Sequence, residues 1–159
     1  LNQDFNREDF SSGIEALDVF LKRHAVKNQK QHLSNTWIAH EKDSTGILGF
    51  HTLSAASITC SSLPERYSKK IPRYPVPCVL LARFAVDKAH HSQGIGSYLL
   101  RDAMNKTIDI SYTIGAYALI VDAKNEKARN FYEYYGFIRL PENDDSLFLP
   151  INTIIQATQ

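Results

Sequence analysis

The chain has 159 residues, enough for one domain with a substantial core, and 43% of them are hydrophobic. Its net charge of +1 excludes a strong overall attraction to nucleic acid. No apolar run approaches the roughly 20 residues of a membrane span, and we expect no secretory signal. The 2 cysteines lack CxxC spacing, which disfavours a zinc or redox site, so we expect a cytoplasmic protein without a metal.

The first half of the chain predicts two helices followed by a meander of strands. Residues 11–13 (SSG) are a candidate cap for a helix whose apolar residues recur with helical spacing, and residues 25–32 predict a second short helix. Strands are expected at residues 36–40 and 47–51 around a polar turn, with residues 53–58 as a third strand.

The second half predicts alternating strands and helices. In chain order, we expect a short helix and an extended connection over 62–77, a strand at 79–86, a helix from 95, a strand at 116–121, a helix at 126–135 ended by Gly136, and strands at 137–140 and 147–149 around a polar turn at 141–145. Residues 1–159 are therefore expected to form a single mixed α/β domain.

Two glycines separated by one residue follow the apolar strand, in the stretch HHSQGIGSYLL that starts at His90. A helix start offers unpaired amides and a positive dipole end, and glycines let an anion approach the backbone, so this turn predicts a phosphate site. A Rossmann site would need a third glycine where Leu99 stands, and a Walker loop would need lysine at Ser97. A tight turn without a ligand is the alternative.

The later stretch KNEKARNFYEYYGF places Asn125, Ala128 and Tyr132 on one stripe of a helix. Phe131 and Phe137 are expected in the core. Tyr132, beside a small and a polar residue, fits a pocket wall better than a packed interior, and its phenol is a candidate proton donor.

Together, the turn HSQGIG and the pattern N-x-x-A-x-x-x-Y-x-x-x-G-F resemble the GNAT acetyltransferase superfamily. The resemblance implies the GNAT fold, a mixed, mostly antiparallel central sheet flanked by helices. It also implies acetyl-CoA as co-substrate. The superfamily motif Q/R-x-x-G-x-G/A, which holds the coenzyme A pyrophosphate, falls here on His91, Gly94 and Gly96, and the later helix supplies Asn125 on the cofactor side and Tyr132 near the thiol.

Across nearly the whole chain, the segments FSSGIEALDVFLKRHAVKNQ, GFHTLS, IPRYPVPCVLLARFAVD, NFYEYYGF and SLFLPI are similar to the GNAT toxins of type II toxin–antitoxin modules. This resemblance implies acetylation of the α-amino group of aminoacyl-tRNA, which stops translation. It implies a ribbon-helix-helix antitoxin as partner and contact with operator DNA only through that antitoxin. It is also compatible with a homodimer.

The resemblance assigns a cofactor-binding set and a general acid. The set is Phe84, Ala85, Val86, His91, Ser92, Gln93, Gly94, Ile95, Gly96, Ser97 and Asn125. The first three belong to a strand that is interrupted in GNAT proteins, so that free amides form an oxyanion hole. His91 and Ser92 depart from the usual Gln or Arg and Gly, and we hypothesise that His91 is charged when the cofactor binds. Tyr132 is the expected general acid for the thiolate.

For the acceptor, the sequence offers basic residues but no evident general base. Candidates for phosphate contacts with tRNA are Lys22, Arg23, Lys27, Lys30 and Arg83, with a second basic run at 66–73 behind them. A solvated face is the alternative for the runs, and Arg83 has the alternative of pairing with a buried acid such as Asp122. An α-amine titrates near roughly 7.7–8.0 and needs less help from a base than a lysine does.

Two other functions remain open on these residues. One is a GNAT enzyme that acetylates a small amine such as a polyamine or amino sugar. The other is a catalytically weak protein whose main role is to bind an antitoxin and, through it, operator DNA. The choice among charged tRNAs depends on surface shape, which the sequence does not give.

Overall fold

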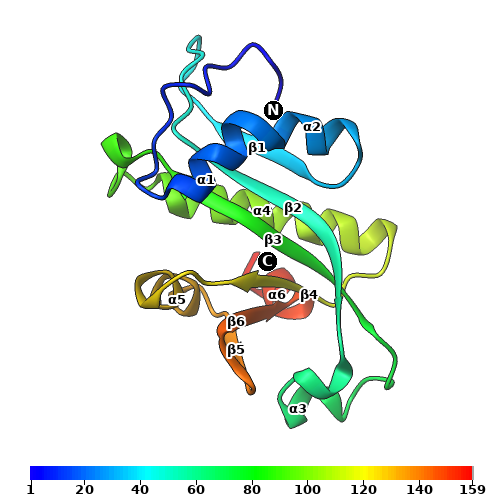
Figure 1. The fold of residues 1–159 in the computed structure, drawn as a ribbon. Helices are drawn as coiled ribbons and strands as arrows, with labels where there is room; N and C mark the ends of the chain where they lie inside the picture. Colours follow the sequence, from blue (N-terminus) through cyan, green and yellow to red (C-terminus); the bar gives the residue numbers. More distant parts are fainter. Residues whose placement is uncertain (159) are drawn as a thin grey trace. The chain divides into compact units, whose positions relative to one another are not determined.

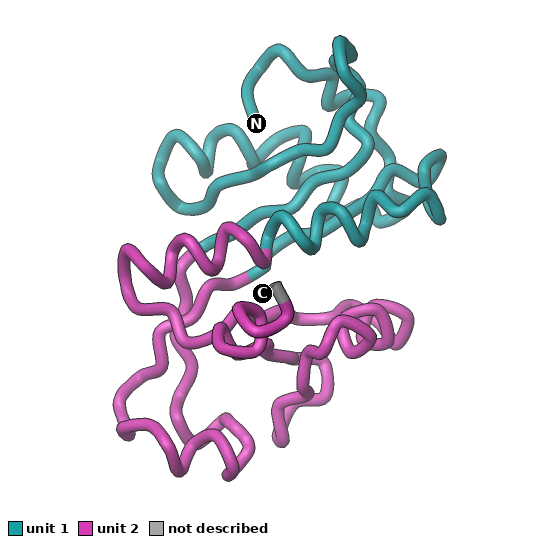
Figure 2. The backbone as a smooth tube through the Cα atoms, turned by 180° about the vertical axis from the view of Figure 1, so that it is seen from behind, with its two compact units in different colours: residues 1–54, 81–103 teal, residues 55–80, 104–159 magenta. Residues whose placement is uncertain are grey.

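The structure is a computed structural model that describes residues 1–158. The backbone groups into two compact units, one of residues 1–54 and 81–103, the other of residues 55–80 and 104–159 (Figure 2). Six strands form a sheet in the order β1-β2-β3-β4-β6-β5, which confirms the expected α/β fold (Figure 1). No helix within the described part is both long and apolar enough to cross a membrane.

The first unit begins with a helical stretch that changes pitch twice. The elements are α1 (Glu15–Val19), a π-helical turn (Phe20–His24), α2 (Ala25–Lys30), β1 (Asn35–Ala39), the first part of β2 (Gly49–Ile58), the second part of β3 (Val76–Val86), a 3₁₀ turn (Lys88–His90) and the start of α4 (Ile95–Thr113). β1 and β2 pair antiparallel, with Trp37 opposite His51. The two predicted helices are therefore one helical run joined by a π turn.

Close packing in this unit brings α4 onto β2. A Cβ at Gly49 would lie 2.7 Å from Leu99 Cδ1 and 2.9 Å from the Ala85 carbonyl oxygen, so only glycine fits there. The buried His51 on β2 bonds Asp102 on α4, with 2.7 Å between Nε2 and Oδ2. These contacts fix the helix that starts directly after the glycine turn.

The second unit carries a hairpin and the helix that precedes it. Its elements are the remainders of β2, β3 and α4, a 3₁₀ turn (Cys60–Ser62), α3 (Glu65–Ser68), β4 (Ala118–Asp122), α5 (Glu126–Tyr134), β5 (Ile138–Leu140), β6 (Asn143–Pro150) and α6 (Ile151–Thr158). β6 pairs antiparallel with both β4 and β5. Its core gathers side chains from several elements, among them Leu63, Val76, Cys78 and Phe148.

Three local expectations are wrong, and one helix was not expected. Residues 49–58 form one strand, β2, with no break at Thr52, because its first five residues are all buried, while residues 47 and 48 lie before it. β6 begins at Asn143, inside the expected turn. Ser12 does not cap α1: its Oγ donates to Asp18 and accepts from the Ile14 amide, and the helix begins at Glu15. Helix α6 was not expected, because its β-branched residues have low helix propensity.

Candidate functional site

The turn after β3 is braced by side chains on both sides. Asp87 accepts hydrogen bonds from the amides of Ala89 at 2.9 Å and Ser11 at 3.0 Å, through different carboxylate oxygens. The His91 ring bonds the carbonyl oxygen of Val86 at 2.9 Å, and because that partner only accepts, Nε2 is the donor. The start of the turn is therefore tied to the end of β3.

The turn reaches α4 through two left-handed residues. Ser92 has φ 65° and Gly94 has φ 81°. A Cβ built at Gly94 would meet no atom within 4 Å, so open space lies beside its backbone. The amides at the start of the 19-residue α4 follow directly. This arrangement confirms the predicted strand–glycine turn–helix geometry, and its exposed backbone can accept an anion.

Strand β3 runs from Val76 to Val86 without interruption. Phe84, Ala85 and Val86 therefore all lie within this strand, and the implied interruption does not end it. Ala85 is 5% exposed and packs in the core of the first unit. Its side chain serves the core, and the oxyanion role of the three amides stays a prediction.

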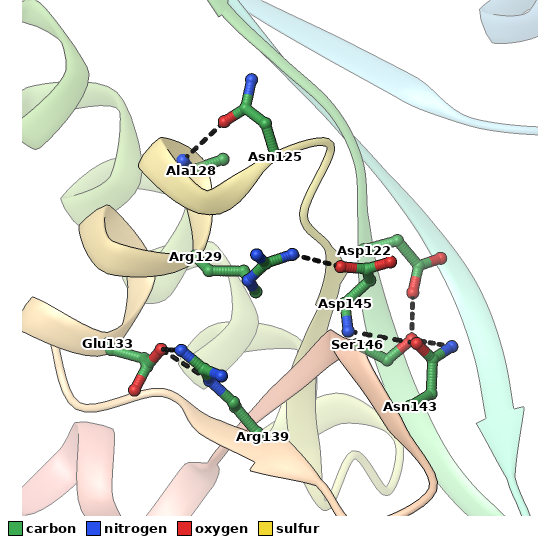
Figure 3. Close-up of polar contacts among 9 residues, drawn as sticks. All are labelled: Asp122, Asn125, Ala128, Arg129, Glu133, Arg139, Asn143, Asp145 and Ser146. Atoms are coloured by element: carbon green, nitrogen blue, oxygen red, sulfur yellow. Dashed lines mark hydrogen bonds and ion pairs between the residues drawn. The ribbon is translucent and has the colours of Figure 1, made fainter.

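Helix α5 begins with a side-chain cap at Asn125. Its Oδ1 accepts from the Ala128 amide at 2.8 Å, while the side-chain nitrogen points away from the helix (Figure 3). This capping role of Asn125 was not predicted, although Asn followed by an acidic first turn is a known signal for the start of a helix. The cap uses the oxygen of Asn125 and leaves the nitrogen directed outward.

Tyr132 lies two residues before the end of α5 and is 5% exposed. The centroids of the Phe131 and Phe137 rings each lie 5.4 Å from the centroid of its ring. The Tyr132 side chain is thus more deeply buried than we expected for a residue that lines a pocket wall. Burial raises the pKa of its phenol, which stays protonated at neutral pH. Gly136 has φ 96° and ends the helix, as predicted.

The predicted tRNA-binding residues have more acidic surroundings than their sequence run suggests. Lys22 and Arg23 line a cavity of about 560 Å³ together with Glu8, Glu15 and Asp18. Lys27 and Lys30 belong to the next helix, α2. Three acids thus lie beside two cations in this cavity, because residues before and within α1 bring their carboxylates next to Lys22 and Arg23.

Arg83 was expected either to reach substrate or to pair with a buried acid such as Asp122. Its guanidinium lies 4.7 Å from the centroid of the Phe20 ring and donates to the carbonyl oxygen of Ala82. Asp122 is exposed and accepts from the Ser146 hydroxyl at 2.5 Å. The expectation that Asp122 is a buried acid is wrong, because β4 ends there at the surface.

Acidic residues gather in a second cavity of the first unit, next to the turn. Its volume is about 390 Å³, and its lining includes Asp9, Glu41 and Asp87 together with His90. Within residues 1–158, no group of three or more His, Cys, Asp or Glu side chains is placed to hold a metal ion.

The comparison with protein families matches residues 32–139 to the acetyltransferase (GNAT) domain. Two curated relatives extend the match over most of the chain. The tRNA-acetylating toxin of Mycobacterium tuberculosis (strain ATCC 25618 / H37Rv) is 34% identical over 88% of this chain and 82% of its own length. A probable toxin TacT of Sinorhizobium fredii (strain NBRC 101917 / NGR234) is 31% identical over 95% of this chain and 90% of its own.

Solved structures agree. AtaT complexed with acetyl-methionyl-tRNAfMet has a TM-score of 0.92 and 34% identity, covering 99% of this chain and 95% of that one. A tyrosine-to-phenylalanine variant of AtaT, bound to the C-terminus of the antitoxin AtaR and to acetyl-CoA, has a TM-score of 0.83 and 31% identity, covering 98% and 92%. A KacTA–DNA complex has a TM-score of 0.80 and 32% identity, covering 98% and 92%. The chain belongs to the GNAT acetyltransferase family and, within it, to the group of toxins that these relatives represent.

Proposed function

We propose that this chain transfers the acetyl group of acetyl-CoA to the α-amino group of aminoacyl-tRNA and thereby blocks translation. The observation that carries the proposal is the match to AtaT with acetyl-methionyl-tRNA, which spans 99% of the chain at 34% identity. A match of this extent includes both the glycine turn and α5, the two segments that the mechanism needs.

Binding of the co-substrate falls to the turn and its flanks. The backbone from His91 through Ser97 and the start of α4 offers amides to the pyrophosphate, and the open space beside Gly94 suits the close approach of a phosphate oxygen. The amides of Phe84, Ala85 and Val86 are proposed to orient the thioester carbonyl. Asn125 contributes its outward-facing nitrogen on the cofactor side.

Tyr132 is proposed as the general acid. As the amine nitrogen bonds to the acetyl carbon and the C–S bond breaks, its phenol donates a proton to the sulfur atom, and the proton that the amine loses passes to solvent, from which the phenol is restored. The phenol is protonated at neutral pH, as this role requires, and burial raises its pKa, so it gives up the proton only to a strongly basic thiolate.

The acceptor supplies its amine in reactive form. An α-amino group titrates near roughly 7.7–8.0, so a large share is neutral at pH 7 without a general base. Lys22, Arg23, Lys27, Lys30 and Arg83 are proposed to contact tRNA phosphates, and the acids beside the first two limit how much each of those cations adds.

The proposed partners are inferred from the same related toxins. A ribbon-helix-helix antitoxin would neutralise the toxin, and contact with operator DNA would run through that antitoxin, as in the toxin–antitoxin complex on DNA found for KacTA. Because charged tRNA is a cytoplasmic substrate, the proposal places the chain in the cytoplasm.

The test is a transfer assay with labelled acetyl-CoA and a total pool of charged tRNA. Wild type runs beside Tyr132→Phe, with polyamines and lysine peptides as competing acceptors. The expected result is label in N-acetyl-aminoacyl-tRNA that is lost in the variant. Label on a small amine instead would overturn the tRNA proposal and leave an acetyltransferase of another substrate class. No transfer to any acceptor would favour the binding-only role.

A further inference from the structure

Arg129 lies on α5 between the two residues to which the mechanism assigns roles, Asn125 and Tyr132. Its guanidinium Nη1 donates to Asp145 Oδ1 on β6 (Figure 3). The Arg129 side chain is 22% exposed and its Nε atom is buried, whereas the Asp145 side chain is 61% exposed. The guanidinium end of the pair is therefore shielded from water and fixed on α5, while the carboxylate is solvated.

Asp145 is itself held through its main chain. Its amide donates to Asn143 Oδ1 at 3.1 Å, and its carbonyl oxygen accepts from the Ala123 amide at 2.6 Å. Ala123 precedes Asn125 and Arg129 follows it. One residue of β6 therefore holds both ends of the segment that carries Asn125 and leads to Tyr132.

The next turn of α5 carries a second ion pair, in which the helix supplies the acidic residue and the hairpin supplies the basic one. Glu133 on α5 pairs with Arg139 on β5 at 2.6 Å (Figure 3). If α5 slipped by one turn along the hairpin, either Glu133 would face Asp145 or Arg129 would face Arg139. Either slip brings like charges together, so the two pairs favour one register of α5 on the hairpin.

We propose that Arg129 and Asp145 form a positioning pair that fixes α5 on the β5–β6 hairpin and thereby holds the phenol of Tyr132 in place for acetyl transfer. The reaction used to test it rests on the proposed function, whereas the placement of Tyr132 does not. Neither residue needs to touch substrate: their effect passes through the rotation and register of the helix.

The test exchanges the charges. Arg129→Glu, Asp145→Arg and the double exchange are compared with wild type in the full-length chain, with Arg129→Lys as the conservative variant. Glu133→Gln is the matched control, since it removes an ion pair on the same helix whose arginine, Arg139, is 41% exposed, against 22% for Arg129. The readouts are kcat and KM for acetyl-CoA with charged tRNA, and the ¹⁹F NMR line of 3-fluorotyrosine at position 132, assigned by its loss in Tyr132→Phe.

Each single reversal should lower kcat by about 10-fold to 100-fold while KM for acetyl-CoA changes by less than about threefold, because misplacing a catalytic group by an ångström costs rate. The ¹⁹F line of Tyr132 should move as well. The double exchange and Arg129→Lys should restore both readouts, and Glu133→Gln should leave kcat within about twofold of wild type.

Unchanged kcat and an unmoved line in a folded single variant would overturn the proposal, as would a double exchange that folds without restoring them. If the single reversals fail to fold, Arg129→Lys and the double exchange still decide the question. If wild type transfers acetyl to no charged tRNA, the proposed function fails, while the ¹⁹F line still reports whether the pair places Tyr132.

Discussion

The glycine turn and α5 carry the two halves of the proposed chemistry, and they are built in opposite ways. The turn from His91 to Gly94 is exposed and offers backbone. α5 offers side chains: a capping Asn125, a buried Tyr132 and an ion-paired Arg129. A backbone site depends on φ angles and tolerates changes of side chain, as His91 and Ser92 illustrate. A side-chain site depends on the packing that places one phenol.

This contrast predicts that the largest loss of kcat follows removal of the Tyr132 hydroxyl. Tyr132→Phe removes one hydroxyl, keeps the ring between its aromatic neighbours, and should lower kcat by about 10²–10⁴-fold, the usual contribution of general acid catalysis. Acetyl-CoA affinity, measured by calorimetry, should stay near the wild-type value. A variant with wild-type kcat would show that Tyr132 only packs.

In the turn, the sensitive property is backbone conformation. Gly94→Ala forces a Cβ onto a residue with φ 81°, at a cost of about 1–2 kcal/mol, so acetyl-CoA should bind roughly tenfold more weakly when the turn relaxes to avoid that strain. The same calorimetric titration measures the change. Ser92→Gly is the control: glycine tolerates its φ of 65°, and affinity should not fall. Equal losses in both variants would point to side-chain contacts instead.

Burial of Tyr132 also predicts a pH dependence of stability. Its pKa is raised in the folded state, so above a pH of roughly 10 the unfolded chain loses this proton while the folded chain keeps it. The stabilisation is present below the unfolded pKa and declines as pH rises beyond it, by up to about 1.4 kcal/mol per pH unit. Urea unfolding at pH 9 and 11 should show a steeper decline for wild type than for Tyr132→Phe; parallel declines would refute the raised pKa.

The smallest effect is expected at the helix cap. Asn125→Ala removes the acceptor of the Ala128 amide and should lower the free energy of unfolding by about 1 kcal/mol. Asn125→Asp keeps a capping oxygen and should preserve stability, but it replaces the outward nitrogen. If that nitrogen serves acetyl-CoA, Asn125→Asp weakens binding without destabilising the fold; unchanged affinity would reduce Asn125 to a cap.

Several elements were predictable because their signals are local. The strand ending at Val86, the glycine turn and the helix after it follow from an apolar run and two glycines in about a dozen residues. Gly136 ends α5 because only a residue tolerant of positive φ fits there. By contrast, α6 was missed, because its isoleucines and threonines indicate strand as readily as helix.

By itself, the sequence determined the order of the elements from β3 to β6, the phosphate-type turn, the residues on one face of α5 and the family, since each depends on neighbours close along the chain. Only the tertiary structure decided that Tyr132 is buried, that Glu8 lines a cavity with Lys22 and Arg23, and that Asp145 holds α5. Arg129 and Asp145 are 16 residues apart, on different elements. No local pattern encodes such a pair, because its partner is chosen by how the hairpin folds back on the helix.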